Sequence, residues 1–170
     1  AKRTVEGDLG VYVNMMNIVE MIGKEELAKL LNLNLEELDF ITDNYKVIPI
    51  NSKEISFVES LTNHATITAL KRHCGHIKAI YGPGGKKNIA DGKDLTQVKY
   101  IIGTGGALTR LPNSIDIVKK ISLSSNGTEL LPNTEAKVLI DNNYIMASLG
   151  VMSMKYPEPA LSLLKESLNI

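Results

Sequence analysis

The chain has 170 residues, of which 44% are hydrophobic and 22% charged, which fits one globular domain or two small lobes and excludes a disordered or fibrous chain. Nineteen basic and nineteen acidic residues give a formal net charge of zero, and neither sign runs in blocks. This excludes an electrostatic surface for nucleic acid or for an anionic membrane. The single cysteine, Cys74, cannot form an internal disulfide, so a reducing cytoplasm is the expected compartment.

The first part of the chain predicts a strand and its return within residues 3–13, followed by three short helices. Because β-type residues start by the fourth position of AKRTVEGDLGVYVN, we expect the chain to begin inside a longer protein. Apolar residues at helical spacing predict a helix that ends at Gly23, and Asn34 with Glu37 predicts the start of another. Together, residues 15–45 predict a small helical insertion.

The rest of the chain alternates strands with helices. A long helix is predicted from Asn51 to Gly75, with Glu54 as its reciprocal cap. After it we expect a hairpin at 76–81 and 86–90, strands at 97–102 and 137–140, and helices at 114–121, 143–154 and 158–168. The stretch 144–154 is far shorter than the ~20 residues of a membrane helix and predicts a buried one. This order predicts an α/β fold, with a mixed sheet flanked by helices.

A glycine cluster, Gly103-Thr104-Gly105-Gly106, follows the third predicted strand in the stretch YIIGTGGALTRLP. Glycine accepts positive φ and lets a ligand approach the main chain, at a cost of roughly 0.5–1 kcal/mol per residue relative to alanine. A helix that begins at Gly105 or Gly106 would offer free N–H groups to a phosphate. The pattern matches neither the Walker loop nor the Rossmann fingerprint. Nucleotide binding and plain chain reversal therefore both remain open.

A second glycine-flanked turn, Gly7-Asp8-Leu9-Gly10, lies near the beginning of the chain. Its carboxylate offers oxygen ligands to a hydrated magnesium ion, and its backbone N–H groups offer donors to phosphate oxygens. Aspartate and glycine are also the commonest residues of ordinary turns. On its own the motif predicts a hairpin.

Two other clusters have simpler structural interpretations. The segment RHCGH at 72–76 gathers two imidazoles and a thiol, but three ligands with a helix-ending glycine among them make a weak metal site. The segment GPGGKK at 82–87 is favoured as a hairpin tip with solvated lysines over a phosphate cradle.

Taken in chain order, three stretches resemble the ATPase core shared by actin, heat-shock chaperones, acetate kinases and sugar kinases. VEGDLGVYVN resembles its second phosphate loop, YIIGTGGALTRLP its adenosine motif, and DNNYIMASLGVMS its connecting helix, with Gly150 at a close-contact position. A closer resemblance is carried by four stretches: RTVEGDLGVYVN, LKRHCGH, DGKDLTQVKYIIGTGGALTRLP and YIMASLGVMSMKYPEPALSLLKESL. They resemble the carboxy-terminal half of the MutL (GlmL) family. The members of this family are accessory proteins of adenosylcobalamin-dependent glutamate mutase and related aminomutases, unrelated to the mismatch-repair protein of that name. The resemblance covers nearly the whole chain.

This resemblance implies that residues 1–170 form a single carboxy-terminal lobe of an actin-like ATPase, of the ribonuclease H-like type, which shares ATP and Mg²⁺ with an amino-terminal lobe. Arg110 in LTRLP resembles an arginine that chaperone relatives place near adenine, although its spacing from the glycines differs and pairing with a helix end is the alternative. No general base is implied. The nucleotide-binding residues that the resemblance implies are Asp8, Leu9, Gly10, Gly103, Thr104, Gly105, Gly106 and Arg110, with Asp8 as the magnesium ligand.

The implied function is that of an ATP-dependent reactivating or chaperone-like factor, with an adenosylcobalamin-dependent mutase as its client. The isolated chain is expected to be inactive, and the parent protein to bind ATP. The sequence is compatible with a homo-oligomer. Residues 15–45 or the hairpin near Gly84 are suggested to contact the client. The alternatives are an enzyme of the same superfamily, of the sugar kinase, acetate kinase or hydantoinase type, and an interaction scaffold whose nucleotide site has decayed.

Overall fold

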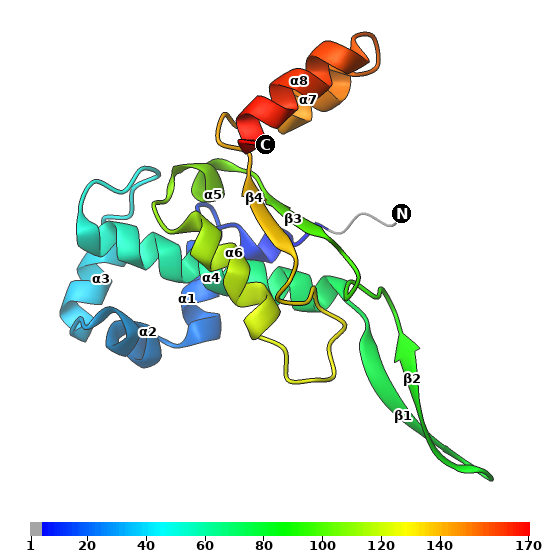
Figure 1. The fold of residues 1–170 in the computed structure, drawn as a ribbon. Coiled ribbons are helices and arrows are strands. Elements are labelled where there is room, and N and C mark those ends of the chain that lie inside the picture. The colour runs from blue at the N-terminus through cyan, green and yellow to red at the C-terminus, as the bar shows by residue number, and fades with distance from the viewer. Residues whose placement is uncertain (1–4) are drawn as a thin grey trace. The chain divides into compact units, whose positions relative to one another are not determined.

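The computed structural model describes residues 5–170, and Figure 1 shows their helices and strands. The chain divides into two compact units between His73 and Cys74. The chain is α/β, because helices occur in both units and strands in the second.

The first unit is helical. Its elements are the short 3-10 helix η1 (Gly7–Leu9), α1 (Met15–Ile22), α2 (Lys24–Leu31), α3 (Leu35–Asp43) and α4 (Ser52–His73). The predicted helices are therefore confirmed. Gly23 ends α1 with a φ of 89°, and Asn34 and Glu37 form the predicted reciprocal cap of α3.

Helices α1 and α2 pack on α4, and α3 packs on α2, around one apolar core. Both α1 and α2 contact α4, and Tyr45 meets Phe57 edge-on with ring centroids 5.8 Å apart. The side chains that are fully buried in this core are Ile18, Val19, Leu27, Leu38, Phe57 and Leu61. Burying these side chains is the main stabilising contribution expected for a helical unit of this size. Helices α1 to α3 thus share a core with α4, whereas their status as an insertion stays a prediction.

The strand and return that we expected within residues 3–13 are not formed in residues 5–13. Arg3 and Thr4 lie outside the described residues. The backbone instead closes a local turn, in which the N–H of Leu9 donates to the carbonyl of Glu6 at 3.1 Å. A strand needs a partner for its N–H and C=O groups, and none of the described strands pairs with this segment.

The second unit begins with a hairpin. Strands β1 (His76–Gly82) and β2 (Gly85–Asp91) pair antiparallel, and β3 (Tyr100–Gly103) pairs with β4 (Lys137–Ile140) in parallel. Its helices are α5 (Gly106–Arg110), α6 (Ser114–Leu123), α7 (Met146–Met152) and α8 (Pro157–Leu168). Helix α6 packs on both strands of the parallel pair through Ile117, Val118 and Ile121, which are buried.

The single mixed sheet that we predicted is wrong for the described residues. The two strand pairs form separate two-stranded sheets. The reason lies at the base of the hairpin, where residues 128–130 take the free edge of β1: the N–H of Ile77 donates to Thr128, and His76 bridges Glu129.

Two further elements differ from expectation. The strand predicted at 97–102 is formed only from Tyr100 to Gly103, because Asp94 and Thr96 form a side-chain turn before it. The helix predicted to be buried at 144–154 spans Met146–Met152, and of its residues only Leu149 is buried. Met154 is 88% exposed, so this prediction of burial is wrong within the described structure.

Candidate functional site

The strongest candidate site lies at the carboxyl ends of β3 and β4. Because the two strands are parallel with Gly103 opposite Ile140, the residues that follow them emerge at the same edge. Thr104 follows one strand and Asp141 the other, and the Thr104 hydroxyl donates to Oδ2 of Asp141 at 2.9 Å. Ligands of open α/β sheets bind at such carboxyl edges. The sequence-predicted glycine cluster therefore lies where this class of fold places its ligands.

Within the cluster the three glycines are in different surroundings. A Cβ at Gly103 would lie 2.8 Å from Cδ1 of Ile140, so close packing alone requires glycine there. Gly105 has a φ of 97° and precedes α5. At Gly105 and Gly106 an added Cβ would meet nothing within 4 Å. Their main chain is therefore open to a ligand, which chain reversal alone does not require of Gly106.

Asp141 is the residue of this site that sequence analysis missed. Its side chain is fully buried, and it accepts hydrogen bonds from Thr104, from Ser167 and from the N–H groups of Ile145 and Met146. Burial by itself would raise the pKa of the Asp141 carboxyl, but these hydrogen bonds outweigh burial and hold the pKa below its ordinary value. An aspartate directly after the apolar strand KVLI was the available signal.

Arg110 ends α5, and its side chain is exposed. This position fits the interpretation in which a cation pairs with a helix end. Contact with an adenine ring stays a prediction.

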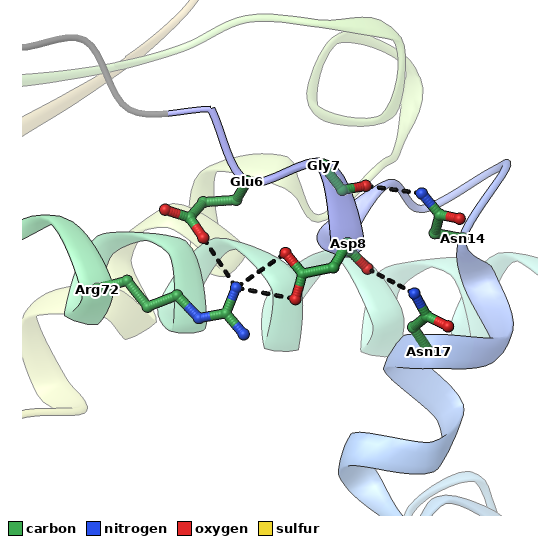
Figure 2. A network of polar contacts seen from close by, with 6 residues as sticks. All are labelled: Glu6, Gly7, Asp8, Asn14, Asn17 and Arg72. Carbon is green, nitrogen blue, oxygen red and sulfur yellow. Dashed lines mark hydrogen bonds and ion pairs between the residues drawn. The ribbon is translucent and has the colours of Figure 1, made fainter.

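The Asp8 motif lies in the first unit and is shown in Figure 2. Nη1 of Arg72 lies 2.9 Å from both carboxylate oxygens of Asp8 and 2.8 Å from Glu6. These two carboxylates, Glu6 first, raise the pKa of Arg72 above its already high ordinary value. Asn14 donates to the carbonyl of Gly7 at 2.7 Å and fixes the turn.

In this arrangement the Asp8 motif does not fit a magnesium site. Mg²⁺ takes octahedral oxygen ligands, but the guanidinium of Arg72 occupies the face of the carboxylate where the ion would bind. The N–H of Leu9, expected to meet phosphate, is used inside the turn by Glu6. Sequence analysis placed Arg72 beside a weak metal cluster and did not foresee its pairing with Asp8.

The described residues offer no other metal centre. Between residues 5 and 170, no group of three or more histidine, cysteine or acidic side chains is placed to hold an ion, and this includes the segment at 72–76. No helix in that same range combines the length and apolar character that crossing a membrane requires.

Fold and site together define an α/β protein with a candidate ligand site at the glycine-rich carboxyl edge of a parallel strand pair. Comparison with known proteins extends this description. The family model described as MutL protein matches residues 1–168. The chain is also 35% identical, over 173 aligned positions, to "Protein MutL" of Clostridium tetanomorphum, and the match covers 99% of this chain and 37% of that relative. The chain therefore belongs to the MutL protein family, which confirms the family resemblance drawn from its motifs.

No solved structure matches the chain. The actin-like ATPase fold thus stays a prediction, while the α/β class is confirmed. Because the chain spans about 37% of the length of its curated relative, the activity and partners of the whole protein are matters for proposal.

Proposed function

We propose that the chain is the nucleotide-binding lobe of an actin-like, ATP-dependent reactivating factor for an adenosylcobalamin-dependent amino-acid mutase of the glutamate mutase type. Membership of the MutL protein family supports an association with such a mutase system. The observation that carries the nucleotide part is the open main chain of Gly105 and Gly106 at the carboxyl edge of β3 and β4. An adenine nucleotide there would place its ribose and α-phosphate against backbone that has no Cβ.

Nucleotide binding is tested by Gly106→Ala in the full-length natural gene product. Gly106 has no positive φ and lies in the first turn of α5, so alanine leaves the local fold intact and places a methyl group only where the ligand would lie. We expect the affinity for a non-hydrolysable ATP analogue, measured calorimetrically with magnesium present, to fall at least roughly tenfold. Gly84→Ala is the matched control, because its Cβ also meets nothing within 4 Å.

Reactivation is tested with a mutase whose site is blocked by a cobalamin that lacks the adenosyl group. We expect the full-length protein with ATP to restore mutase activity on addition of adenosylcobalamin, and to fail without ATP. Restoration that is independent of nucleotide would contradict the proposal. Fast phosphoryl transfer to a sugar or to acetate would favour the kinase alternative instead.

A second candidate function, an interaction scaffold with a decayed nucleotide site, is favoured by one observation. Arg72 binds both carboxylate oxygens of Asp8, and the N–H of Leu9 donates to the carbonyl of Glu6 within its own turn. The groups expected to bind phosphate and Mg²⁺ therefore already have partners within the chain. A full-length protein that binds no adenine nucleotide but still binds the mutase would establish this alternative.

The client-contact surface that we favour is the hairpin β1–β2. Every residue of both strands is exposed. Beyond the base, where residues 128–130 pair with β1, the hairpin is a two-stranded ribbon, which has little stability of its own in water. Tyr81 is 75% exposed beside the turn, and Lys86 and Lys87 follow it with no ion pair to the described residues. An acidic surface on the client would complement this tip.

A further inference from the structure

The carboxylate of Asp141 is a buried charge held only by neutral donors. Thr104 and Ser167 donate their hydroxyls at 2.9 and 2.6 Å, and the N–H groups of Ile145 and Met146 donate at 3.2 and 2.9 Å. None of the described lysines or arginines forms an ion pair with it. A buried carboxylate destabilises the folded state unless its oxygens accept hydrogen bonds, so the loss of any one of these donors costs free energy of folding.

Three of the four donors stabilise the end of the chain, and one reaches the glycine cluster. Ser167 lies in α8, while Ile145 is the N-cap residue of α7 and Met146 is its first residue. Thr104 is the only residue of the cluster with a side chain, and its hydroxyl is directed to Asp141. The backbone N–H of Asp141 also donates to the carbonyl of Gly103 at 2.9 Å. Two hydrogen bonds, one from the Thr104 hydroxyl and one to the Gly103 carbonyl, therefore join the glycine cluster to Asp141 at the end of β4.

The cluster needs such a tether. Glycine loses more conformational freedom on ordering than any other residue, and nothing packs where the Cβ atoms of Gly105 and Gly106 would be. On the side of α5, the hydroxyl of Thr109 donates to the carbonyl of Gly105 at 3.0 Å and to that of Gly106 at 3.4 Å, and the N–H of Thr109 donates to the carbonyl of Gly105. Thr109 thus holds the cluster to α5, and Thr104 is the side chain of the cluster that holds it to the end of β4.

We propose that Asp141 is a positioning residue, which holds Thr104 so that the main chain of Gly105 and Gly106 is preorganised to receive the nucleotide. The nucleotide part rests on the proposed function, whereas the ordering of the loop stands on the geometry alone. The side chain of Asp141 is fully buried, so it acts through Thr104 and is not accessible to a ligand. Its effect is to remove the entropic cost that an untethered glycine loop would add to binding.

The two carboxylate oxygens separate the positioning role from a structural one. Oδ2 accepts from Thr104 and Met146, whereas Oδ1 accepts from Ser167 and Ile145. Thr104→Val keeps the shape of the side chain and removes the loop tether. Ser167→Ala removes a hydrogen bond from the same carboxylate without touching the loop. Thr104→Ser retains the hydroxyl and is the conservative rescue.

The experiment uses these three variants in the full-length natural gene product. Hydrogen exchange of the peptide covering residues 100–110 is measured without nucleotide, and the dissociation constant of a non-hydrolysable ATP analogue is measured with magnesium. For Thr104→Val we expect faster exchange and roughly tenfold weaker binding, the size of one lost hydrogen bond to a charged group. Thr104→Ser should resemble the wild type in both measurements. Ser167→Ala should lower the melting temperature and leave exchange and affinity unchanged.

Exchange in Thr104→Val that equals the wild-type rate would overturn the proposal, whatever happens to binding. If Thr104→Val and Ser167→Ala weaken binding equally, each in proportion to its loss of stability, then Asp141 has only a structural role and the proposal is overturned as well. If the wild type binds no adenine nucleotide but Thr104→Val still loosens the loop, the proposed function fails while the positioning of the loop is supported.

Discussion

Gly103 and Ile140 face each other across the parallel pair β3–β4, so closely that a Cβ on Gly103 would lie 2.8 Å from Cδ1 of Ile140. The same Cβ would lie 3.2 Å from Cδ1 of Leu108. Gly103 therefore has a packing role, distinct from the open backbone of Gly105 and Gly106. The glycine cluster thus combines one residue that the core requires with two that leave the main chain accessible.

Substitution of Gly103 tests this division. Gly103→Ala overpacks the strand pair and should lower the free energy of unfolding of the chain by about 1–3 kcal/mol in urea titration. Ile140→Val removes Cδ1 and makes room, so the double variant should be more stable than the sum of the two single effects predicts. Gly106→Ala, whose Cβ meets nothing within 4 Å, should change stability by less than about 0.5 kcal/mol. Strict additivity of the first two substitutions would contradict the packing role.

Much of the local structure could be predicted because its causes lie within a few residues. The cap formed by Asn34 and Glu37 joins residues three positions apart, and the strand at 137–140 and the hairpin turn are bounded by their own turn residues. By contrast, Asp141 meets Thr104 from 37 positions away and Ser167 from 26. Side-chain pairing at such separations leaves no periodic signal in the sequence.

The candidate site was therefore predicted in part. The glycine cluster could be recognised from its composition, and the apolar run before it predicted that the cluster lies at the end of a strand. The state of Asp8 was not foreseeable, because its partner Arg72 lies 64 positions away on α4. The burial expected for 144–154 failed for a similar reason, since an apolar helix is buried only if another element covers it.

Acid stability should depend on Asp141. Its pKa is lower in the folded chain than in the unfolded one, so the ionised carboxylate favours the folded state. That contribution is fully present above the unfolded pKa of about 3.9 and is lost as the pH falls through the lower, folded value. Asp141→Asn should be less stable than the wild type at neutral pH and should lose less stability on acidification. Thermal unfolding from pH 7 to pH 2 measures both slopes.

The loss of stability at low pH will not disappear in Asp141→Asn, because other carboxyl groups also have lowered pKa values. They owe their shifts to hydrogen bonds from nearby side chains and backbone, and none is fully buried: Glu37 and Glu54 are half-buried, and Asp91 and Asp94 are exposed. Asp94→Asn is a suitable control, since it removes one such exposed carboxylate. An equal change of slope in Asp94→Asn and Asp141→Asn would contradict a special contribution from the buried residue.

Arg72 should control whether Asp8 is able to bind a cation. Its guanidinium occupies both carboxylate oxygens of Asp8 and one of Glu6, so Arg72→Gln leaves two neighbouring acids without their cation. We expect this variant to bind Mn²⁺, a spectroscopic substitute for Mg²⁺, more tightly than the wild type in electron paramagnetic resonance titrations. Arg110→Gln is the matched control, because Arg110 ends α5 and forms no ion pair with an acidic side chain among the described residues. Equal Mn²⁺ affinity in all three proteins would show that Arg72 does not compete with a cation at Asp8.

The hairpin tip should contribute to client binding through its charge. Lys86 pairs in register with Tyr81, and Lys87 with Ile80, which places two cations beside two exposed apolar side chains on opposite faces of the ribbon. Lys86→Glu/Lys87→Glu reverses both charges without altering any buried group. In the full-length protein we expect roughly tenfold or greater loss of affinity for the mutase at low salt, with a smaller difference at high salt because screening weakens both attraction and repulsion.

The control for the hairpin carries the same chemical change elsewhere in the second unit. Lys119→Glu/Lys120→Glu reverses two adjacent exposed cations on α6, outside the hairpin, and should leave mutase binding at the wild-type level. Circular dichroism checks that each double variant is folded. If both pairs weaken binding equally, the effect comes from net charge and the hairpin has no special role. If neither does, the client contacts another surface, and substitution of exposed residues on the 15–45 helices, which leaves their shared core intact, becomes the decisive comparison.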